Sequence, residues 1–244
     1  KGSAVVSLLL VWIAKMDSKR KVALLLGPPG TGKTMIEEAV TEGLQAQSGE
    51  RWIYLDNEWS FTRKQRVRCS RRADIPLDTA EYTEAFGIPG REAYQGLIAS
   101  LARQGLNVLA TAPFEDLSYE SNGLPRYREL SEGIFAEFEL RVVYILLWPS
   151  TQPVLNSQTI LTDPSMLEIE SIVRERLFSR SVNDADQRVL DTPKLKLDNY
   201  YRQRASLVLQ SVEKFNLPLV KIGPAESKAS IVERVIGAFA APVT

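Results

Sequence analysis

The chain contains no histidine and only one cysteine, Cys69. The absence of histidine excludes Ser/His/Asp triads, Cys/His dyads and histidine-ligated metals. A single cysteine can form neither an internal disulfide nor a cysteine-based zinc site, and it fits a reducing compartment, so we expect a cytoplasmic protein. Any proton transfer must therefore use a carboxylate, a lysine, a tyrosine or water.

The sequence also lacks an excess of charge, because 30 Lys and Arg residues balance 30 Asp and Glu residues. The molecule as a whole has no field that would draw it to nucleic acid or to a membrane, so we expect neither partner. An apolar run at residues 4–14 has about half the length of a spanning helix and no signal-peptide cleavage site. We expect residues 1–15 to be an N-terminal extension, either an addition before a start at Met16 or a genuine terminal strand or helix.

From residue 22 onward, short apolar runs alternate with longer amphipathic segments, which is typical of a parallel sheet covered by helices. This α/β pattern and the average composition predict one domain over residues 16–244. The expected strands are 22–27, 52–56, 106–112, 141–148 and 218–223. The expected helices are 33–47, 78–86, 90–104, 126–139, 165–180, 197–215 and 226–240. In the third of these helices, apolar residues recur at steps of three and four, which predicts a buried stripe of Ala93, Tyr94, Leu97, Ile98 and Leu101.

Residues 27–34 read GPPGTGKT and match the pattern GxxxxGK[S/T], directly after an apolar run and directly before a helical segment. The glycines let the backbone wrap closely around phosphate, with N–H groups and the positive helix end facing the anion. Lys33 reaches the β- and γ-phosphates, and the Thr34 hydroxyl is a Mg²⁺ ligand. The expected site for ATP and Mg²⁺ is Gly27, Pro28, Pro29, Gly30, Thr31, Gly32, Lys33 and Thr34.

Three classes of nucleotide-binding protein remain open at this point: a phosphotransferase, a mechanical or switch NTPase, and a nucleotide sensor. A mechanical ATPase of the AAA type needs a strand ending in Asp-Glu well downstream of the loop. The run WIYLDNE comes only about twenty residues after the loop, so it is the second strand of the sheet. The third strand ends at Thr111, where metal-coupled hydrolysis would favour an acid, and no NKxD motif for reading guanine is present.

The order of motifs resembles the P-loop small-molecule kinases, the group of chloramphenicol phosphotransferase, gluconate kinase, zeta-toxin and nucleoside-monophosphate-like kinases. The matching segments are GPPGTGKT, the acid after strand two, REAYQGLIASLARQGLNVLATAPF, VVYILLWP and RERLFSR. The resemblance implies a five-stranded parallel sheet of order 2-3-1-4-5, flanked by helices, with an arginine-bearing lid. It also implies an acceptor-covering region at 57–90 and an insert with the lid at 149–196. The chain departs from the group at Thr111, where an Asp is frequent, and at its long 149–164 connection.

Asp56 closes the second strand and is the candidate catalytic acid. Because ligands of open parallel sheets bind outside the carboxyl ends of the strands, Asp56 is expected to point into the crevice that the loop faces. In the resembling kinases an acid here orients or deprotonates the acceptor hydroxyl, or holds Mg²⁺ through water, so Asp56 is also a candidate metal residue. A helix cap or a turn residue is the structural alternative, and Glu58 is the reserve candidate.

Arg176 and Arg180 lie one turn apart on the helix expected from residue 165. Cations that close over the γ-phosphate neutralise its developing charge and exclude water. The pair matches the lid RxxxR of the resembling kinases, with Arg174 and Arg188 as neighbours that could substitute. The alternative is a solvated face on which Glu168, Glu170 and Glu175 pair with these arginines.

Residues 63–72 hold six positive charges and no negative one, which favours contact with an anionic acceptor through Arg63, Arg66 and Arg68. A solvated surface is the alternative. We expect an ATP-dependent phosphotransferase that moves the γ-phosphoryl group to a hydroxyl, or as a second choice to a nitrogen, of a small anionic molecule. Two other readings stay open: an ATP-hydrolysing switch or assembly NTPase without an acceptor, and a polynucleotide-end kinase.

Overall fold

The computed structural model describes most of the chain from residue 19 to residue 241. The described residues are 19–56, 72–75, 80–112, 117, 120–121, 124–150, 154–179 and 200–241.

A five-stranded parallel sheet forms the centre of the molecule, in the order β2-β3-β1-β6-β7. The strands are β1 (Lys21–Leu26), β2 (Trp52–Asp56), β3 (Asn107–Ala112), β6 (Glu139–Leu147) and β7 (Leu219–Ile222). Numbered along the chain, this is the order 2-3-1-4-5, so the predicted fold class is confirmed. All five predicted strands are present, with small differences at their ends.

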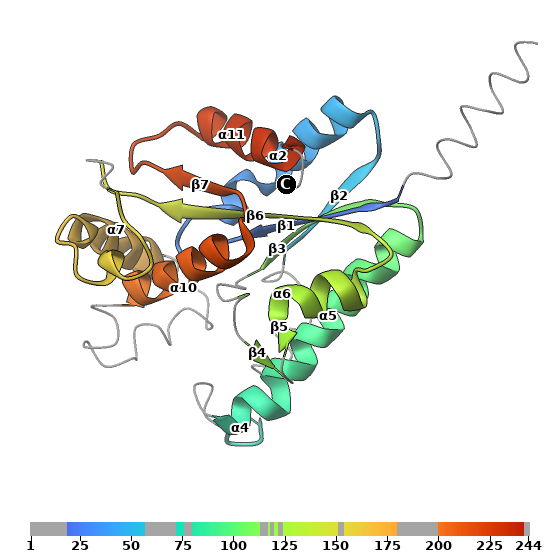
Figure 1. Cartoon of the computed structure of the whole chain (residues 1–244), viewed down its shortest axis with the longest axis horizontal. Helices are drawn as coiled ribbons and strands as arrows, with labels where there is room; N and C mark the ends of the chain where they lie inside the picture. Colours follow the sequence, from blue (N-terminus) through green and yellow to red (C-terminus); the bar gives the residue numbers. More distant parts are fainter. Residues whose placement is uncertain are drawn as a thin grey trace, which may run out of the picture.

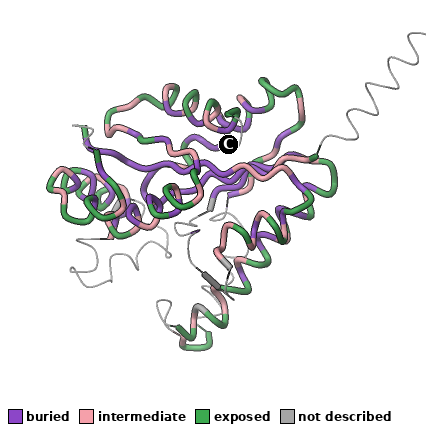
Figure 2. Tube along the Cα trace, in the orientation of Figure 1, coloured by how far each residue is buried: buried purple, intermediate pink, exposed green. Residues whose placement is uncertain are grey.

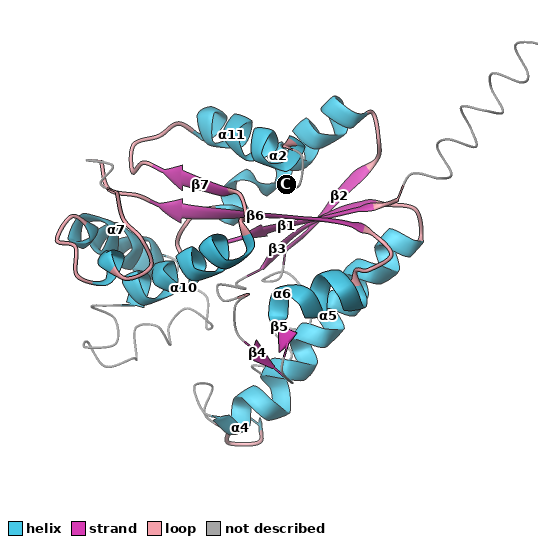
Figure 3. Ribbon diagram, viewed as in Figure 1, coloured by secondary structure: helices cyan, strands magenta, loops and turns pink. Residues whose placement is uncertain are grey.

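Helices cover both faces of the sheet, as Figure 1 and Figure 3 show. One face carries α2 (Lys33–Ser48) and α11 (Lys228–Ala240), which pack against each other. The other face carries α5 (Ile88–Arg103) and α10 (Tyr200–Phe215). The helix α7 (Met166–Ser179) packs against α10. A short 3₁₀ turn, η3 (Thr159–Leu161), precedes α7 in the chain.

The segment before α5 and the segment after β3 are built from short elements. A helical run leads into α5 through α4 (Ala80–Tyr82) and the π-helical η1 (Thr83–Gly87). A two-stranded antiparallel sheet of β4 (Glu120–Ser121) and β5 (Leu124–Pro125) is followed by α6 (Arg126–Arg128) and the π-helical η2 (Glu129–Ile134). The sequence predicted one helix over 126–139 here. The helical turns end at Ile134 because the backbone of Gly133 leaves helical geometry (φ −106°, ψ −109°).

The central strands are buried on both faces, as the purple trace in Figure 2 shows. Every residue from Val22 to Leu26 in β1 is at most 1% exposed, because helices cover both of its faces. Such strands read as continuous apolar runs, which is why the sequence pattern found them. Within the described residues, no helix combines the length and the apolar character needed to cross a bilayer.

Candidate functional site

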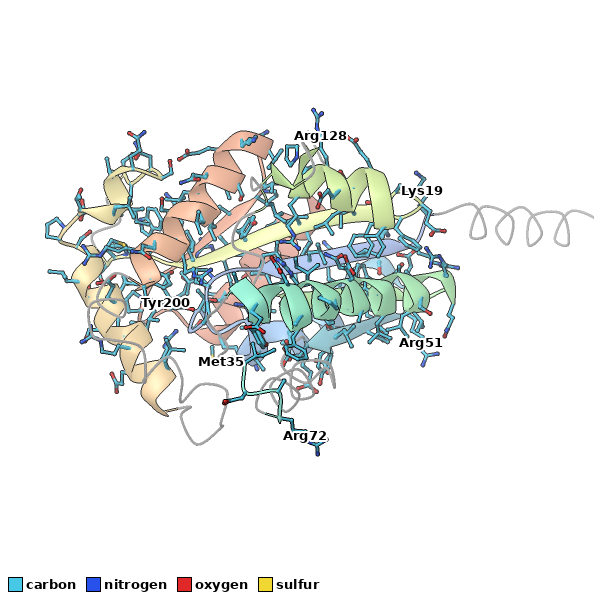
Figure 4. The ribbon with its side chains drawn as sticks, turned by 90° about the horizontal axis from the view of Figure 1, so that it is seen from below. Lys19, Met35, Arg51, Arg72, Arg128 and Tyr200 are labelled. Atoms are coloured by element: carbon cyan, nitrogen blue, oxygen red, sulfur yellow. The ribbon has the colours of Figure 1, made fainter. Side chains whose placement is uncertain are left out.

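The GPPGTGKT segment forms the connection from the carboxyl end of β1 to the first turn of α2. β1 lies between β3 and β6, so this loop leaves the sheet at its centre. In Figure 4, Lys19 and Arg51, which precede β1 and β2, lie at the right of the view, and Met35 in the first turn of α2 lies well to their left. The loop therefore lies at the carboxyl edge of the sheet, where open parallel sheets bind their ligands.

Three glycines give the loop its course. Gly27, Gly30 and Gly32 have φ values of +154°, +82° and +90°, a region that side-chain-bearing residues rarely adopt. A Cβ at position 27 would run into the main-chain carbonyl of Ile145 in β6. The loop is closed from within by the Thr31 hydroxyl, which donates to the Pro28 carbonyl oxygen at 2.9 Å. Glycine is required here by backbone conformation and, at position 27, by close packing.

Lys33 and Thr34 begin α2 directly after the loop. The Lys33 ammonium donates to the carbonyl oxygens of Gly27 at 2.5 Å and Pro28 at 3.0 Å. The ammonium therefore lies against the first residues of the loop, whose backbone would surround an anion. Thr34 is exposed, which leaves its hydroxyl accessible to a ligand.

Helix α7 packs directly against the loop. A Cβ built at Gly30 would lie 3.1 Å from the Val173 side chain, and Arg176 Nη1 donates to the Gly30 carbonyl oxygen at 3.0 Å. Glu170, which the sequence offered as a partner for these arginines, instead forms an ion pair with Arg202 of α10, at 2.9 Å. The structure thus brings Arg176 to the loop, whereas Arg180 lies outside the described residues.

Asp56 is buried at the end of β2, beside an acid that the sequence analysis missed. The Thr111 hydroxyl, near the end of β3, is a donor within hydrogen-bond distance of two carboxylates, 3.1 Å from Glu37 Oε2 and 3.3 Å from Asp56 Oδ1. Glu37 belongs to α2, one turn after Lys33, and is only 4% exposed. Two carboxylates and one hydroxyl, from three different elements, therefore meet at the carboxyl edge of the sheet.

Tyr94 of α5 lies next to this group and ties the ends of β2 and β3 together. Its hydroxyl contacts the carbonyl oxygens of Leu55 at 2.5 Å and Thr111 at 3.0 Å. Burial raises the pKa of Tyr94 far above its ordinary value, and the nearby charges of Asp56 and Glu37 raise it further. Tyr94 therefore stays a neutral hydrogen-bond donor beneath the two carboxylates.

The donors at this edge fit Mg²⁺, which prefers oxygen ligands and usually keeps several waters and substrate phosphates. Thr34 offers a hydroxyl and Asp56 a carboxylate. The described residues contain no group of three or more His, Cys, Asp or Glu that could hold a metal by itself.

Several predicted residues lie outside the described part of the chain: Glu58, Arg63, Arg66, Arg68, Arg180 and Arg188. Of the basic run at 63–72, only Arg72 is described, and it is exposed.

A cavity of about 790 Å³ lies away from the loop, between α2 and α11. Its lining includes Ala39, Val232 and Ile236, and no residue of the GPPGTGKT segment contributes to it. A triphosphate needs N–H donors and cations, so this apolar groove is not the candidate site.

The β1–loop–α2 unit defines a P-loop fold. A family model for the parvovirus non-structural protein NS1 matches residues 2–47, which include this unit but less than half of the chain. No curated protein matches the sequence.

Two solved structures with which the chain aligns are both named as kinases. The shikimate kinase from Acinetobacter baumannii in complex with shikimate is 12% identical, with a TM-score of 0.43, over 91% of this chain and 93% of that chain. The APS kinase of Mycobacterium tuberculosis in complex with AMPPNP and APS is 13% identical, with a TM-score of 0.41, over 92% of this chain and 99% of that chain. At these values the two structures say nothing about the acceptor of this chain.

Proposed function

We propose that this protein is an ATP-dependent phosphotransferase that moves the γ-phosphoryl group of ATP to a hydroxyl of a small, anionic acceptor. The observation that carries the proposal is the meeting of two features at one edge of the sheet. The first is a glycine loop that leads from β1 into α2, and the second is the buried Asp56 at the end of a neighbouring strand. An anion-binding loop holds a donor, and an acid beside it can receive a proton from an acceptor.

The loop is the proposed site for the phosphates of ATP. Its N–H groups and the positive end of α2 favour the negative charge of the phosphates. Lys33 is proposed to move from the carbonyl oxygens of Gly27 and Pro28 to the β- and γ-phosphate oxygens, because a full negative charge attracts an ammonium more strongly than a carbonyl does. Thr34 is the proposed Mg²⁺ ligand, with Asp56 acting through water. The metal, when bound, neutralises charge that develops on the phosphate oxygens.

Asp56 is proposed to accept the proton of the acceptor hydroxyl as the new O–P bond forms and ADP leaves. Asp56 is buried at the end of a strand that pairs with β3, which fixes the carboxylate and favours this role because proton transfer needs a fixed geometry. Glu58 stays the reserve candidate. Arg176, which donates to the Gly30 carbonyl oxygen, is close enough to the loop to neutralise charge on the transferred group, with Arg180 as its proposed partner.

An anionic acceptor is favoured by the basic run that follows β2. Arg63, Arg66 and Arg68 come within about a dozen residues of Asp56 in the sequence, and arginine binds carboxylate and phosphate through two parallel hydrogen bonds. The proposed acceptor therefore carries at least one carboxylate or phosphate.

The proposal is tested by measuring ADP release with a panel of small acceptors, including sugars, amino-acid derivatives, nucleotides and sugar acids. Turnover that rises with one acceptor class supports a kinase. Steady turnover that no acceptor changes would instead indicate an NTPase that hydrolyses ATP without an acceptor. Turnover stimulated only by polynucleotide ends would replace the small molecule with nucleic acid.

A further inference from the structure

The group formed by Glu37, Thr111 and Asp56 has one feature that the proposed transfer does not use. The Thr111 hydroxyl has a single proton, yet it lies within hydrogen-bond distance of two carboxylate oxygens, at 3.1 Å from Glu37 and 3.3 Å from Asp56. The hydroxyl can donate to only one of them at a time. The two carboxylates therefore compete for one donor.

All three side chains are fixed by regular structure. Asp56 and Thr111 are direct register partners on the neighbouring parallel strands β2 and β3. Glu37 extends from the buried side of the long helix α2, whose first residue is Lys33. Thr111 and Glu37 are 3% and 4% exposed, so water does not readily replace either partner. Buried hydrogen bonds between rigid elements hold their geometry, and each group is expensive to leave unpaired.

The charge in this group comes from two elements. Thr111, next to the last residue of β3, brings a hydroxyl and no charge to this edge of the sheet, and Asp56 of β2 brings a carboxylate. Glu37 brings a carboxylate to the same hydroxyl from the helix that follows the phosphate loop. The negative charge comes from a different element but reaches the same edge of the sheet.

We propose that Glu37 is a positioning residue for phosphoryl transfer, which acts on Asp56 through the Thr111 hydroxyl. By accepting the proton of that hydroxyl, Glu37 fixes the rotation of the Thr111 side chain and keeps the hydroxyl from donating to Asp56 Oδ1, a hydrogen bond that makes a carboxylate a weaker base. Without the Glu37 carboxylate, the hydroxyl turns its proton to Asp56 and occupies the oxygen that the acceptor needs. The inference rests on the proposed function, because it assigns Glu37 a role in the same reaction.

The test begins with Glu37→Gln, which keeps the shape of the side chain and removes its charge. We expect kcat to fall by about 10- to 100-fold, as is usual when a group that orients a reacting residue is lost. The KM for ATP should stay within about twofold, because the loop, Lys33 and Thr34 are the residues proposed to hold the nucleotide and Glu37→Gln leaves them in place. The matched control is Glu38→Gln, the exposed neighbour on the same helix, which should leave both constants unchanged.

The relay through Thr111 is tested by two substitutions at that position. Thr111→Val removes the hydroxyl at nearly constant shape, so no proton can turn to Asp56, and it should lower kcat less than Glu37→Gln does. The double variant should recover the kcat of Thr111→Val, because Glu37 is proposed to act only through that hydroxyl. Thr111→Ser keeps a hydroxyl and should retain most of the activity. If Thr111→Val does not fold, Thr111→Ala removes the same hydroxyl without added bulk.

A second readout needs no acceptor and therefore separates this inference from the proposed function. Urea unfolding of Glu37→Gln, Asp56→Asn and their double variant measures whether the two carboxylates are coupled. We expect the two changes to be more strongly non-additive with Thr111 present than with Val at position 111, where only repulsion between the two buried carboxylates couples them. A stronger coupling with Thr111, together with no transfer to any acceptor, would support the role of the hydroxyl and refute the kinase. Equal coupling in the two backgrounds, or Glu37→Gln with normal kcat, would overturn the role of Glu37 whatever the acceptor screen gives.

Discussion

Replacing Tyr94 with phenylalanine tests the scaffold that holds the candidate site together. The Tyr94 hydroxyl lies within 2.5 Å of the Leu55 carbonyl oxygen and 3.0 Å of the Thr111 carbonyl oxygen, at the ends of two adjacent strands. The side chain is only 1% exposed, so water cannot replace the lost donor. Tyr94→Phe should therefore loosen the ends of β2 and β3, which carry Asp56 and Thr111.

The size of the effect follows from the loss of one buried donor. A buried acceptor left without its partner costs about 1–3 kcal/mol, so we expect the free energy of unfolding to fall by about 2 kcal/mol near neutral pH. For a chain of this length, that lowers Tm by roughly 4–8 °C.

The stability that Tyr94→Phe loses relative to the wild type should become smaller at alkaline pH. Burial raises the pKa of Tyr94 in the folded state, so folding keeps the phenol protonated after the unfolded chain has begun to lose its proton at a pKa of about 10. The stability that the neutral phenol contributes is present below that pH and is lost as the pH rises above it. At pH 11 the free energy of unfolding of the wild type should be about 1.4 kcal/mol lower because of this residue, whereas Tyr94→Phe should show no such decrease.

The measurement is urea unfolding of both proteins at pH 8 and pH 11. The difference between their free energies of unfolding should narrow by about 1.4 kcal/mol between the two pH values. Tyr54→Phe, at an exposed tyrosine of β2, is the control and should change stability by less than about 0.5 kcal/mol at pH 8. A difference between wild type and Tyr94→Phe that stays constant with pH would refute the reasoning.

Four further predictions concern the chemistry of the site. Lys33→Ala should lower kcat by about 10²- to 10³-fold, since a cation on the transferred phosphates is lost, and steady-state assay of the folded variant checks this. Asp56→Asn should lower kcat by about 10²- to 10⁴-fold with little change in ATP affinity by calorimetry, and loss of affinity instead would assign Asp56 to nucleotide binding. Arg176→Ala should slow acceptor-dependent turnover at unchanged Tm, whereas the exposed neighbour Arg174→Ala should not; a lower Tm with normal turnover would make Arg176 structural. Arg66→Ala should raise the acceptor KM and spare that of ATP, and the wild-type acceptor KM should rise with salt, because charge contacts are screened within about 10 Å at 0.1 M.

The central strands β1 and β3 could be predicted from the sequence because they are covered on both faces and therefore show as apolar runs. The outer strands β2 and β7 are partly exposed, but their shorter runs were still mostly apolar, and each of the five runs became a strand. The helical stripe at 93–101 was only partly right. Tyr94 and Ile98 are buried, but Leu97 is 41% exposed, since the helix turns the Tyr94 side of its surface toward the strand ends. Periodicity predicted one buried stripe of five residues, and tertiary contacts decided which of them are buried.

The residues of the candidate site were also predicted only in part. The loop and Asp56 could be found because a local motif and a strand end mark them. Glu37 was missed because its contact with Thr111 joins residues 74 positions apart. One signal was present: Glu37 lies on the buried side of α2 with Ile36, Val40 and Leu44, where a charged residue needs a specific reason.

The most direct test of the central claim follows the γ-phosphate itself. ATP labelled at the γ-position is incubated with the protein, Mg²⁺ and the acceptor that most stimulates ADP release, and the label is traced by chromatography. We predict that the label appears in the phosphorylated acceptor, in an amount equal to the ADP formed, and that Lys33→Ala forms it about 10²- to 10³-fold more slowly. Label recovered only as inorganic phosphate, at a rate that the acceptor does not change, would contradict the account.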